Sequence, residues 1–197
     1  MARKVRGADR MPPLSPSKLS AAQKAAATEL AAGPRGGVVG PFIAALRSPE
    51  LMSRLQRLGE YVRYDNVLGP RLTEFAILLT ARAWTQQFIW AMHVESAAEH
   101  GVARGVIDAI ALGRRPRRMA GDESVVYELL AELGKAQVVS DATYERAVAA
   151  FGEAGVIDLL AVAGYYATLA MILNVARTPL PPGRSPLLRP LPARSRR

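Results

Sequence analysis

The segment RLTEFAILLTARAWTQQFIWAMHVESAAEHG, residues 71–101, sets the architecture expected for the whole chain. Its apolar residues recur at helical spacing over 71–82 and again from about residue 85 to residue 100. Gly101 ends the second pattern, as glycine commonly does just after a helix. We expect a turn at Ala83-Trp84-Thr85, with Thr85 as the new N-cap. The segment therefore predicts two consecutive helices joined by a short turn.

Helical spacing continues outside this segment, and almost no stretch alternates with a period of two. Ser20 and Gly33 bound one predicted helix, and Ser48-Pro49-Glu50 has the cap, proline and acid that begin another. GRRPRR, residues 113–118, is expected to be a loop. Ser140 opens a later helix, and residues 156–177 form the last one. The sequence predicts an all-α protein of about seven helices.

Proline and glycine divide the chain into three parts. Pro34 and the glycines at 36, 37 and 40 indicate a linker after a basic, partly helical N-terminal extension, residues 1–39. A single domain is expected over 40–183. Residues 184–197, rich in proline and arginine, are expected to form a mobile tail, for which binding to a proline-recognising partner is a minor alternative.

Composition excludes several kinds of chemistry. The 197 residues contain no Cys, which excludes disulfides, thiolate metal sites and cysteine nucleophiles. With only two histidines, we expect no metal site and no cofactor. The net charge is +9, but residues 1–40 and 177–197 carry the excess while the body is slightly acidic. Nucleic-acid binding through these basic ends is therefore the weakest of three functional hypotheses.

One segment has the length of a membrane span. Residues 159–176 are 18 residues without a formal charge, although they include Tyr165, Tyr166, Thr168 and Asn174. So many polar groups favour a buried core helix or a helix at a subunit interface. The N-terminal residues have no apolar stretch of the secretory kind. We expect a cytoplasmic protein that does not bind membranes.

Glu74 and His93 are the two candidate catalytic residues. Glu74 lies in the apolar stretch TEFAILLTA, where burial would raise its pKa and suit it to acid–base chemistry. The alternative is a solvated Glu74 paired with Arg71 or Arg82. Imidazole titrates near neutrality, so His93 is a candidate proton shuttle, the alternative being a satisfied core histidine. His100 is interpreted as a structural cap at a helix C-terminus.

The spacing of the two candidates gives a test. In one unbroken helix, 19 residues would separate Glu74 and His93 by roughly 28 Å. They can share a site only if the chain turns between them or if they meet across subunits. A turn at 83–85 would also bring the amides of Gln86 and Gln87 toward the same pocket. Trp90, three residues before His93, is a candidate pocket wall, with core packing as the alternative.

Several segments in order resemble the carboxymuconolactone decarboxylase family. They are GPFIAALRSPEL (40–51), LGEYVRYDNVLGPRLTEFAILLTARAW (58–84), His93-x₆-HGV, GRRP (113–116), VSDATYERAVAAFGEAGVIDLLAVAGYYATLAMILN (139–174) and PLPPG (179–183). The resemblance covers roughly residues 40–183. It implies the helical fold of alkylhydroperoxidase-D-like (AhpD-like) proteins, which form homo-oligomers, often trimers or hexamers.

The resemblance also separates two kinds of chemistry. The peroxidase branch of this group has a Glu, a Cys-x-x-Cys pair and a His, which correspond here to Glu74, Gln86, Ile89 and His93. Without thiols, a peroxidase cycle has no nucleophile. The decarboxylase branch needs no thiol and no cofactor, because the carbanion left by CO₂ is delocalised into a conjugated enolate. In the most similar single-domain relatives an acidic residue commonly precedes the Trp, whereas Ile89 precedes Trp90 here.

The leading hypothesis is therefore a cofactor-free enzyme that acts on a small organic acid or lactone by decarboxylation or a related proton transfer. His93 is the general acid or base, and Glu74 orients or deprotonates it. The expected substrate-binding residues are Gln87, Trp90, Tyr166 (with Tyr165 as its nearest rival), and Arg71 or Arg82, which would bind a carboxylate. The second hypothesis is a non-catalytic family member that binds a ligand or serves as an oligomeric scaffold.

Overall fold

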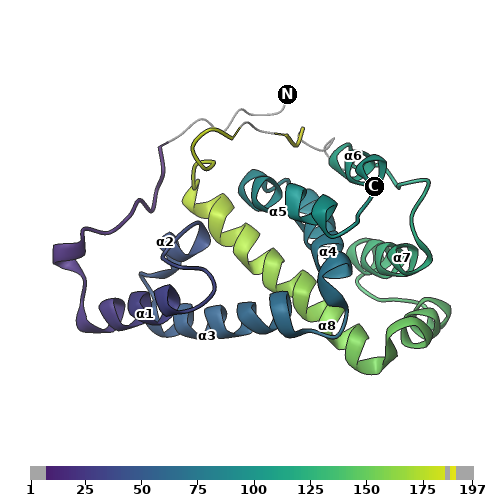
Figure 1. The fold of residues 1–197 in the computed structure, drawn as a ribbon, viewed down its shortest axis with the longest axis horizontal. Coiled ribbons are helices and arrows are strands. Elements are labelled where there is room, and N and C mark those ends of the chain that lie inside the picture. The colour runs from purple at the N-terminus through teal and green to yellow at the C-terminus, as the bar shows by residue number, and fades with distance from the viewer. Residues whose placement is uncertain (1–7, 185–186, 190–197) are drawn as a thin grey trace.

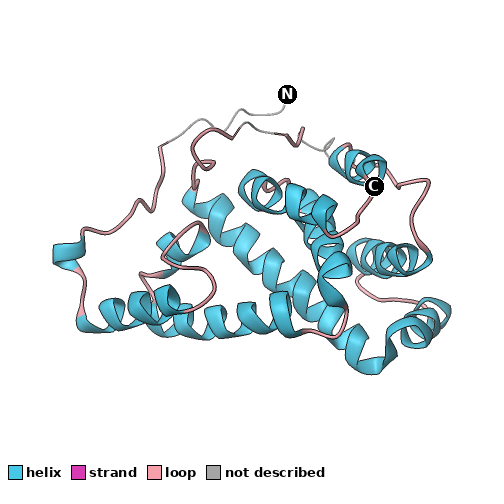
Figure 2. Ribbon diagram, in the orientation of Figure 1, coloured by secondary structure: helices cyan, strands magenta, loops and turns pink. Residues whose placement is uncertain are grey.

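The computed structural model describes residues 8–184 and 187–189, which form helices and loops without a strand (Figures 1 and 2). The all-α architecture is thus confirmed, with eight α-helices in the described part. They are α1 (Ala21–Ala32), α2 (Pro41–Ala45), α3 (Pro49–Glu60), α4 (Gly69–Ala83), α5 (Gln87–Glu99), α6 (Arg104–Ala111), α7 (Gly121–Ala136) and α8 (Asp141–Ala176). Pro16–Lys18 form a 3₁₀ turn and Tyr61–Asp65 a π-helical turn.

The long helix α8 crosses the middle of the molecule, with α4, α5 and α7 on one side and α2 and α3 on the other (Figure 1). Its regular path is interrupted at Gly152, whose φ of 68° is one that glycine adopts at little cost. Phe75 and Leu78 of α4 and Leu159 and Leu173 of α8 are fully or almost fully buried in the main core. Packing in this core fixes the relative positions of the helices that carry the candidate functional residues.

Within the described residues, α8 is the one helix with the length and hydropathy of a membrane span. Half of its most apolar 18-residue window is buried inside the fold. Leu159, Val162 and Leu173 are part of that buried half and pack in the main core. In the chain itself, α8 therefore serves as a core helix, as the polar residues in its sequence suggested.

Helix α1 begins and ends where the sequence indicated. The Ser20 hydroxyl accepts a hydrogen bond from the Gln23 backbone, the Gln23 side chain caps Ser20 in return, and Gly33 follows the last turn. Leu30 of α1 packs with Phe42 of α2 and Met52 of α3 in a second apolar cluster. This cluster joins residues on both sides of the linker predicted near residue 39.

Two expected N-caps differ in the structure. Pro49 is at the start of α3 as predicted, but the Ser48 side chain makes no capping hydrogen bond. Thr85 is not the N-cap of α5: it has a φ of 48°, and Gln86 caps the helix instead. The Gln86 side-chain oxygen accepts a 2.6 Å hydrogen bond from the Phe88 backbone. The predicted turn between α4 and α5 exists, and it is completed by a glutamine one residue later.

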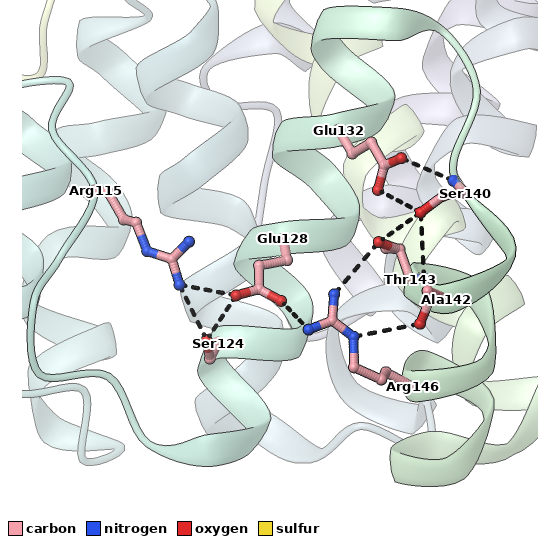
Figure 3. A network of polar contacts seen from close by, with 8 residues as sticks. All are labelled: Arg115, Ser124, Glu128, Glu132, Ser140, Ala142, Thr143 and Arg146. Carbon is pink, nitrogen blue, oxygen red and sulfur yellow. Dashed lines mark hydrogen bonds and ion pairs between the residues drawn. The ribbon is translucent and has the colours of Figure 1, made fainter.

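A surface network of polar side chains joins the GRRPRR loop to α7 and α8 (Figure 3). Glu128 of α7 contacts Arg115 of the loop and Arg146 of α8, each at 2.8 Å. Glu132 accepts a 2.8 Å hydrogen bond from the Ser140 backbone, at the start of α8. Exposed ion pairs of this kind contribute little individually, so we assign the network to positioning the loop rather than to the site.

Candidate functional site

Glu74 and His93 meet in the interior, on the two helices predicted to flank the turn. The Glu74 Oε2 atom lies 2.7 Å from His93 Nδ1. Their exposed fractions are 4% for Glu74 and 6% for His93. The turn at residues 84–86 reverses the chain between α4 and α5, so that groups 19 residues apart form a direct hydrogen bond. Of the two arrangements considered from sequence, the chain therefore has the one within a single subunit.

The carboxyl group of Glu74 has two hydrogen-bond partners and one nearby guanidinium. Burial raises its pKa, but hydrogen bonding and charge attraction from His93, the Arg63 guanidinium and the Ser96 hydroxyl together hold the pKa below its ordinary value. The raised pKa expected from sequence is therefore wrong, because the apolar neighbours in the sequence are outweighed by polar partners from other turns. Since an ionised carboxylate only accepts hydrogen bonds, His93 Nδ1 is assigned as the donor.

Two of these partners were not found from the sequence. Ser96, one turn after His93 on α5, donates a 3.1 Å hydrogen bond to Glu74 Oε1. Arg63 approaches the same oxygen at 3.8 Å from the π-helical turn. The i, i+3 spacing of His93 and Ser96 is a signal that could have indicated Ser96. Nothing in the sequence pattern marks the π-helical turn that carries Arg63.

A cavity of about 500 Å³ opens beside His93. Two arginines and a histidine border the cavity: Arg35, Arg63 and His93. No Asp or Glu is among the described residues that line it. Because Nδ1 is bonded to Glu74, Nε2 is the ring nitrogen left to act on a ligand. The remaining lining residues are Pro34, Val39, Gly40, Pro41, Phe42, Tyr64, Phe88, Ile89, Met92, Tyr166, Leu169 and Pro181.

Tyr166 forms part of the wall next to His93. Its ring stands edge-on to the imidazole, with 5.1 Å between centroids and planes at 90°. Burial raises the pKa of its phenol well above the ordinary value, so the hydroxyl stays protonated and can donate a hydrogen bond. Tyr165 packs edge-on against Tyr166, and its hydroxyl oxygen accepts a 3.4 Å hydrogen bond from the Arg35 guanidinium. Between the two tyrosines, Tyr166 is the one that borders the cavity.

The predicted N-terminal extension contributes directly to this cavity. Arg35 lies in the loop between α1 and α2, where its guanidinium stacks over the Phe42 ring at 5.0 Å. Gly59 of α3 makes room for the Arg35 and Tyr165 side chains. A Cβ at Gly59 would come within 2.0 Å of the Tyr165 hydroxyl and 2.4 Å of Arg35. The lack of a side chain at Gly59 therefore allows Arg35 to reach the cavity.

Four predicted substrate-binding residues are not among those that line the His93 cavity. Gln87 binds the backbone of Leu187 and Leu188 with both ends of its amide. Trp90 is 1% exposed and packs in the main core, which was the alternative considered for it. Arg71 forms ion pairs with Asp122 and Glu123 of α7, and Arg82 borders a different cavity. The position of each side chain is set by contacts with residues that are distant in the sequence, and the local sequence pattern does not reveal these contacts.

The two residues that correspond to the peroxidase cysteines, Gln86 and Ile89, have different roles in the structure. Ile89 borders the His93 cavity with an apolar side chain. Gln86 caps α5 and donates a 2.9 Å hydrogen bond to the Asn174 side chain on α8. Asn174 in turn donates a hydrogen bond to the Trp84 carbonyl oxygen at 3.3 Å, so it satisfies a backbone group. The described residues contain no cluster of three or more Asp, Glu or His arranged to hold a metal ion.

The fold and the pair together define an all-helical protein with a buried carboxylate–imidazole site in a helical hairpin. Residues 49–131 match the model of the carboxymuconolactone decarboxylase family. A similar solved structure is that of a protein of unknown function from Agrobacterium tumefaciens, suggested to be an antioxidant defence protein AhpD. Its TM-score is 0.61 at 20% identity, over 70% of this chain and 94% of that one. No curated protein matches the sequence. The sequence match to this family therefore extends over residues 49–131, and the structural likeness shows an AhpD-like fold.

Proposed function

We propose that the protein is a cofactor-independent enzyme that decarboxylates a small organic acid or lactone, or transfers a proton on such a substrate. One observation carries this proposal: the 2.7 Å hydrogen bond between Glu74 and His93 Nδ1, which leaves His93 Nε2 for chemistry in the cavity. A carboxylate behind an imidazole fixes the tautomer and stabilises the imidazolium form. This pairing suits His93 to receive a proton and to return it.

The charges around the cavity favour an anionic substrate. Arg35 and Arg63 both border it, and the described lining residues include no Asp or Glu. A guanidinium binds a carboxylate through two parallel hydrogen bonds, which orients the bound group as well as attracting it. Phe42, Phe88 and Met92 supply apolar contacts for the carbon skeleton. A small acid with an apolar ring or chain matches both properties.

The proposed reaction needs a single acid–base residue. When the carbon–carbon bond to the departing carboxylate breaks, CO₂ leaves and the electron pair passes into the conjugated enolate of the lactone. Protonated His93 then delivers the Nε2 proton to carbon, and the neutral imidazole regains a proton from water. Glu74 offsets the positive charge of the imidazolium. Arg63, Arg35 and the protonated Tyr166 hydroxyl are the groups available to hold the negative charge that develops on oxygen.

The proposal also includes the oligomeric state of the protein and its cellular compartment. We propose a homo-oligomer, such as a trimer or hexamer, acting in the cytoplasm on a small-molecule substrate without membrane or nucleic-acid partners. The outward face of α8 supports an oligomer, because Ile157, Met171 and Val175 are all strongly exposed there. Subunit contact along α8 would remove these apolar side chains from water.

A ligand-binding role is the second candidate, and Ile89 favours it. This apolar side chain borders the cavity at the position where the most similar relatives commonly carry an acid. A pocket with Arg35 and Arg63 but without that acid can bind an organic anion without turning it over. The two candidates therefore share a ligand class and differ in whether His93 transfers a proton.

The experiment combines turnover with binding. Purified protein is incubated with a panel of unsaturated γ-lactone acids, and CO₂ release is measured together with deuterium incorporation into the product in D₂O. We expect His93→Gln to lower kcat by about 10²- to 10⁴-fold, the usual contribution of a general acid or base. His100→Gln is the matched control and should keep full activity, because His100 is exposed at the end of α5.

Glu74→Gln separates proton transfer from simple binding. A glutamine can still accept the Nδ1 hydrogen bond but cannot offset the imidazolium charge, so kcat should fall while the affinity for the acid changes little. If wild-type protein binds the acids by calorimetry but releases no CO₂ and exchanges no deuterium, the enzymatic proposal is wrong and the ligand-binding role stands.

A further inference from the structure

A second cavity lies on the other side of α4, bounded by α6, α7 and α8. Its volume is about 440 Å³, and it shares no lining residue with the His93 cavity. Its lining residues are Leu79, Thr80, Arg82, Ala83, Trp84, Ile110, Gly113, Arg114, Tyr127, Leu130, Ala131, Leu133, Gly134, Ala163, Gly164 and Ala167. This volume is within the range of small-molecule sites.

Small residues on α7 and α8 create this space. A Cβ added to Gly134 or to Gly164 would meet no atom within 4 Å, which shows that both helix surfaces border an opening. Leu79, Leu130 and Tyr127 supply larger apolar walls. The hydroxyl of Thr80 is already bonded to the Ala76 carbonyl oxygen at 2.9 Å, so it presents little unmet polarity. Most of the cavity therefore offers apolar contact.

Arg82 is the exception, and its charge has no acidic partner among the described residues. Arg82 is only 5% exposed, and its Nη1 atom donates a 2.7 Å hydrogen bond to the Arg189 carbonyl oxygen. Its Nε is buried without a hydrogen-bond partner within the described chain. Burial lowers the pKa of the guanidinium from its ordinary value, yet arginine remains charged near neutrality. A neutral carbonyl leaves this buried charge uncompensated.

Arg71, on the same helix, shows the usual arrangement. Its guanidinium contacts the carboxylates of Asp122 and Glu123, so its charge is balanced within the chain. Arg82, in contrast, has no carboxylate partner among the described residues. Arg114 also borders the cavity and adds a second positive charge at its rim, while no Asp or Glu is among the described lining residues.

We propose that this cavity is a second small-molecule site, which binds an amphipathic carboxylate with its head group on Arg82 and its apolar tail between α7 and α8. The site is independent of the His93 cavity and of any activity there. The carboxylate would balance the buried guanidinium, and the tail would cover the surfaces around Gly134 and Gly164. A ligand with the same tail and a cationic head group should be excluded by Arg82 and Arg114.

The test compares two ligands and two arginine variants by calorimetry. Decanoate and decyltrimethylammonium share a ten-carbon chain and differ in head-group charge, and both are used below their micelle concentrations. We expect decanoate to bind at least about tenfold more tightly than the cation, and Arg82→Gln to weaken decanoate binding by about tenfold or more. Arg104→Gln, an exposed arginine paired with Glu95, is the matched control and should leave the affinity unchanged.

A space-filling variant tests the position of the tail. Gly164→Leu is expected to abolish decanoate binding without loss of thermal stability, because the side chain enters open space and leucine favours a helix. His93→Gln should bind decanoate normally. Equal binding of both ligands, or an affinity unaffected by Arg82→Gln and Gly164→Leu, would overturn the proposal. The proposal would also be overturned if the wild-type protein bound no decanoate and Gly164→Leu had a lower oligomeric mass than the wild type. That result would mean that a second copy of the chain covers the cavity.

Discussion

The two cavities that flank α4 have similar volumes but balance their buried charges differently. Beside His93, the Glu74 carboxylate has two hydrogen-bond donors, His93 and Ser96, and the Arg63 guanidinium lies 3.8 Å away as an ion-pair partner. Beside Arg82, the guanidinium has a neutral carbonyl oxygen and no carboxylate among the described residues. A balanced ionic group next to an imidazole can hold and move a proton, whereas an unbalanced one attracts an ion. Charge balance, more than cavity size, is therefore the basis on which we propose proton transfer for one cavity and ligand binding for the other.

The largest effect on stability is expected at the balanced site. Glu74→Leu removes the acceptor of His93 and Ser96 and leaves buried donors without partners, so we expect the free energy of unfolding to fall by about 3 kcal/mol. Urea unfolding monitored by circular dichroism measures this loss. Glu95→Leu is the matched control: its pair with Arg104 is exposed, so the loss should be much smaller than that of Glu74→Leu. Equal losses in the two variants would contradict the contrast.

The pH dependence of stability gives a smaller effect at the same residue. The pKa of Glu74 is lower in the folded protein than in the unfolded chain, so its ionised form stabilises the fold. This contribution is complete above the unfolded-chain value of about 4.3 and is lost as the pH falls through the lower folded value. The stability difference between wild type and Glu74→Gln should therefore shrink as the pH falls from 6 to 3. A difference that grew toward low pH would mean that the pKa is raised.

The smallest change is expected at the unbalanced site. Arg82→Met removes one hydrogen bond to the Arg189 carbonyl oxygen, a loss of about 1 kcal/mol, but it also relieves the burial of an uncompensated charge. The two effects offset each other, so the free energy of unfolding without added ligand should change by less than about 1 kcal/mol. A loss near that of Glu74→Leu would show that Arg82 is balanced in the assembled protein, and the two cavities would then be alike.

The sequence predicted the parts of the site that depend on local signals. Helical periodicity on either side of residues 83–85 located the turn, and the turn brought Glu74 to His93. Tyr166 of the predicted last helix also borders the cavity. These features follow from patterns within a few turns of helix, which is the range over which sequence periodicity carries information.

The parts that the sequence did not predict depend on distant contacts. Arg35 reaches the cavity from a segment that had been assigned to a separate extension, across a close approach at Gly59. Gln87 was expected to bind substrate, but residues 187 and 188 occupy its amide. The predicted direction of the Glu74 pKa shift was wrong because His93, Arg63 and Ser96, which are distant from Glu74 in the sequence, together outweigh the effect of burial. The tertiary structure, and not the neighbouring residues along the chain, determines which group binds to a polar side chain.

The short turn between α4 and α5 also has a consequence for how the molecule assembles. Only three residues separate the two helices, so little chain entropy is lost when Glu74 and His93 come together. Arg35 and Tyr166, by contrast, join the same cavity from opposite ends of the sequence, and contacts of that range form slowly. We therefore expect this hairpin to be an early folding unit. The hydrogen-bonded pair of Glu74 and His93 would then form while still in contact with water, before the cavity walls enclose it.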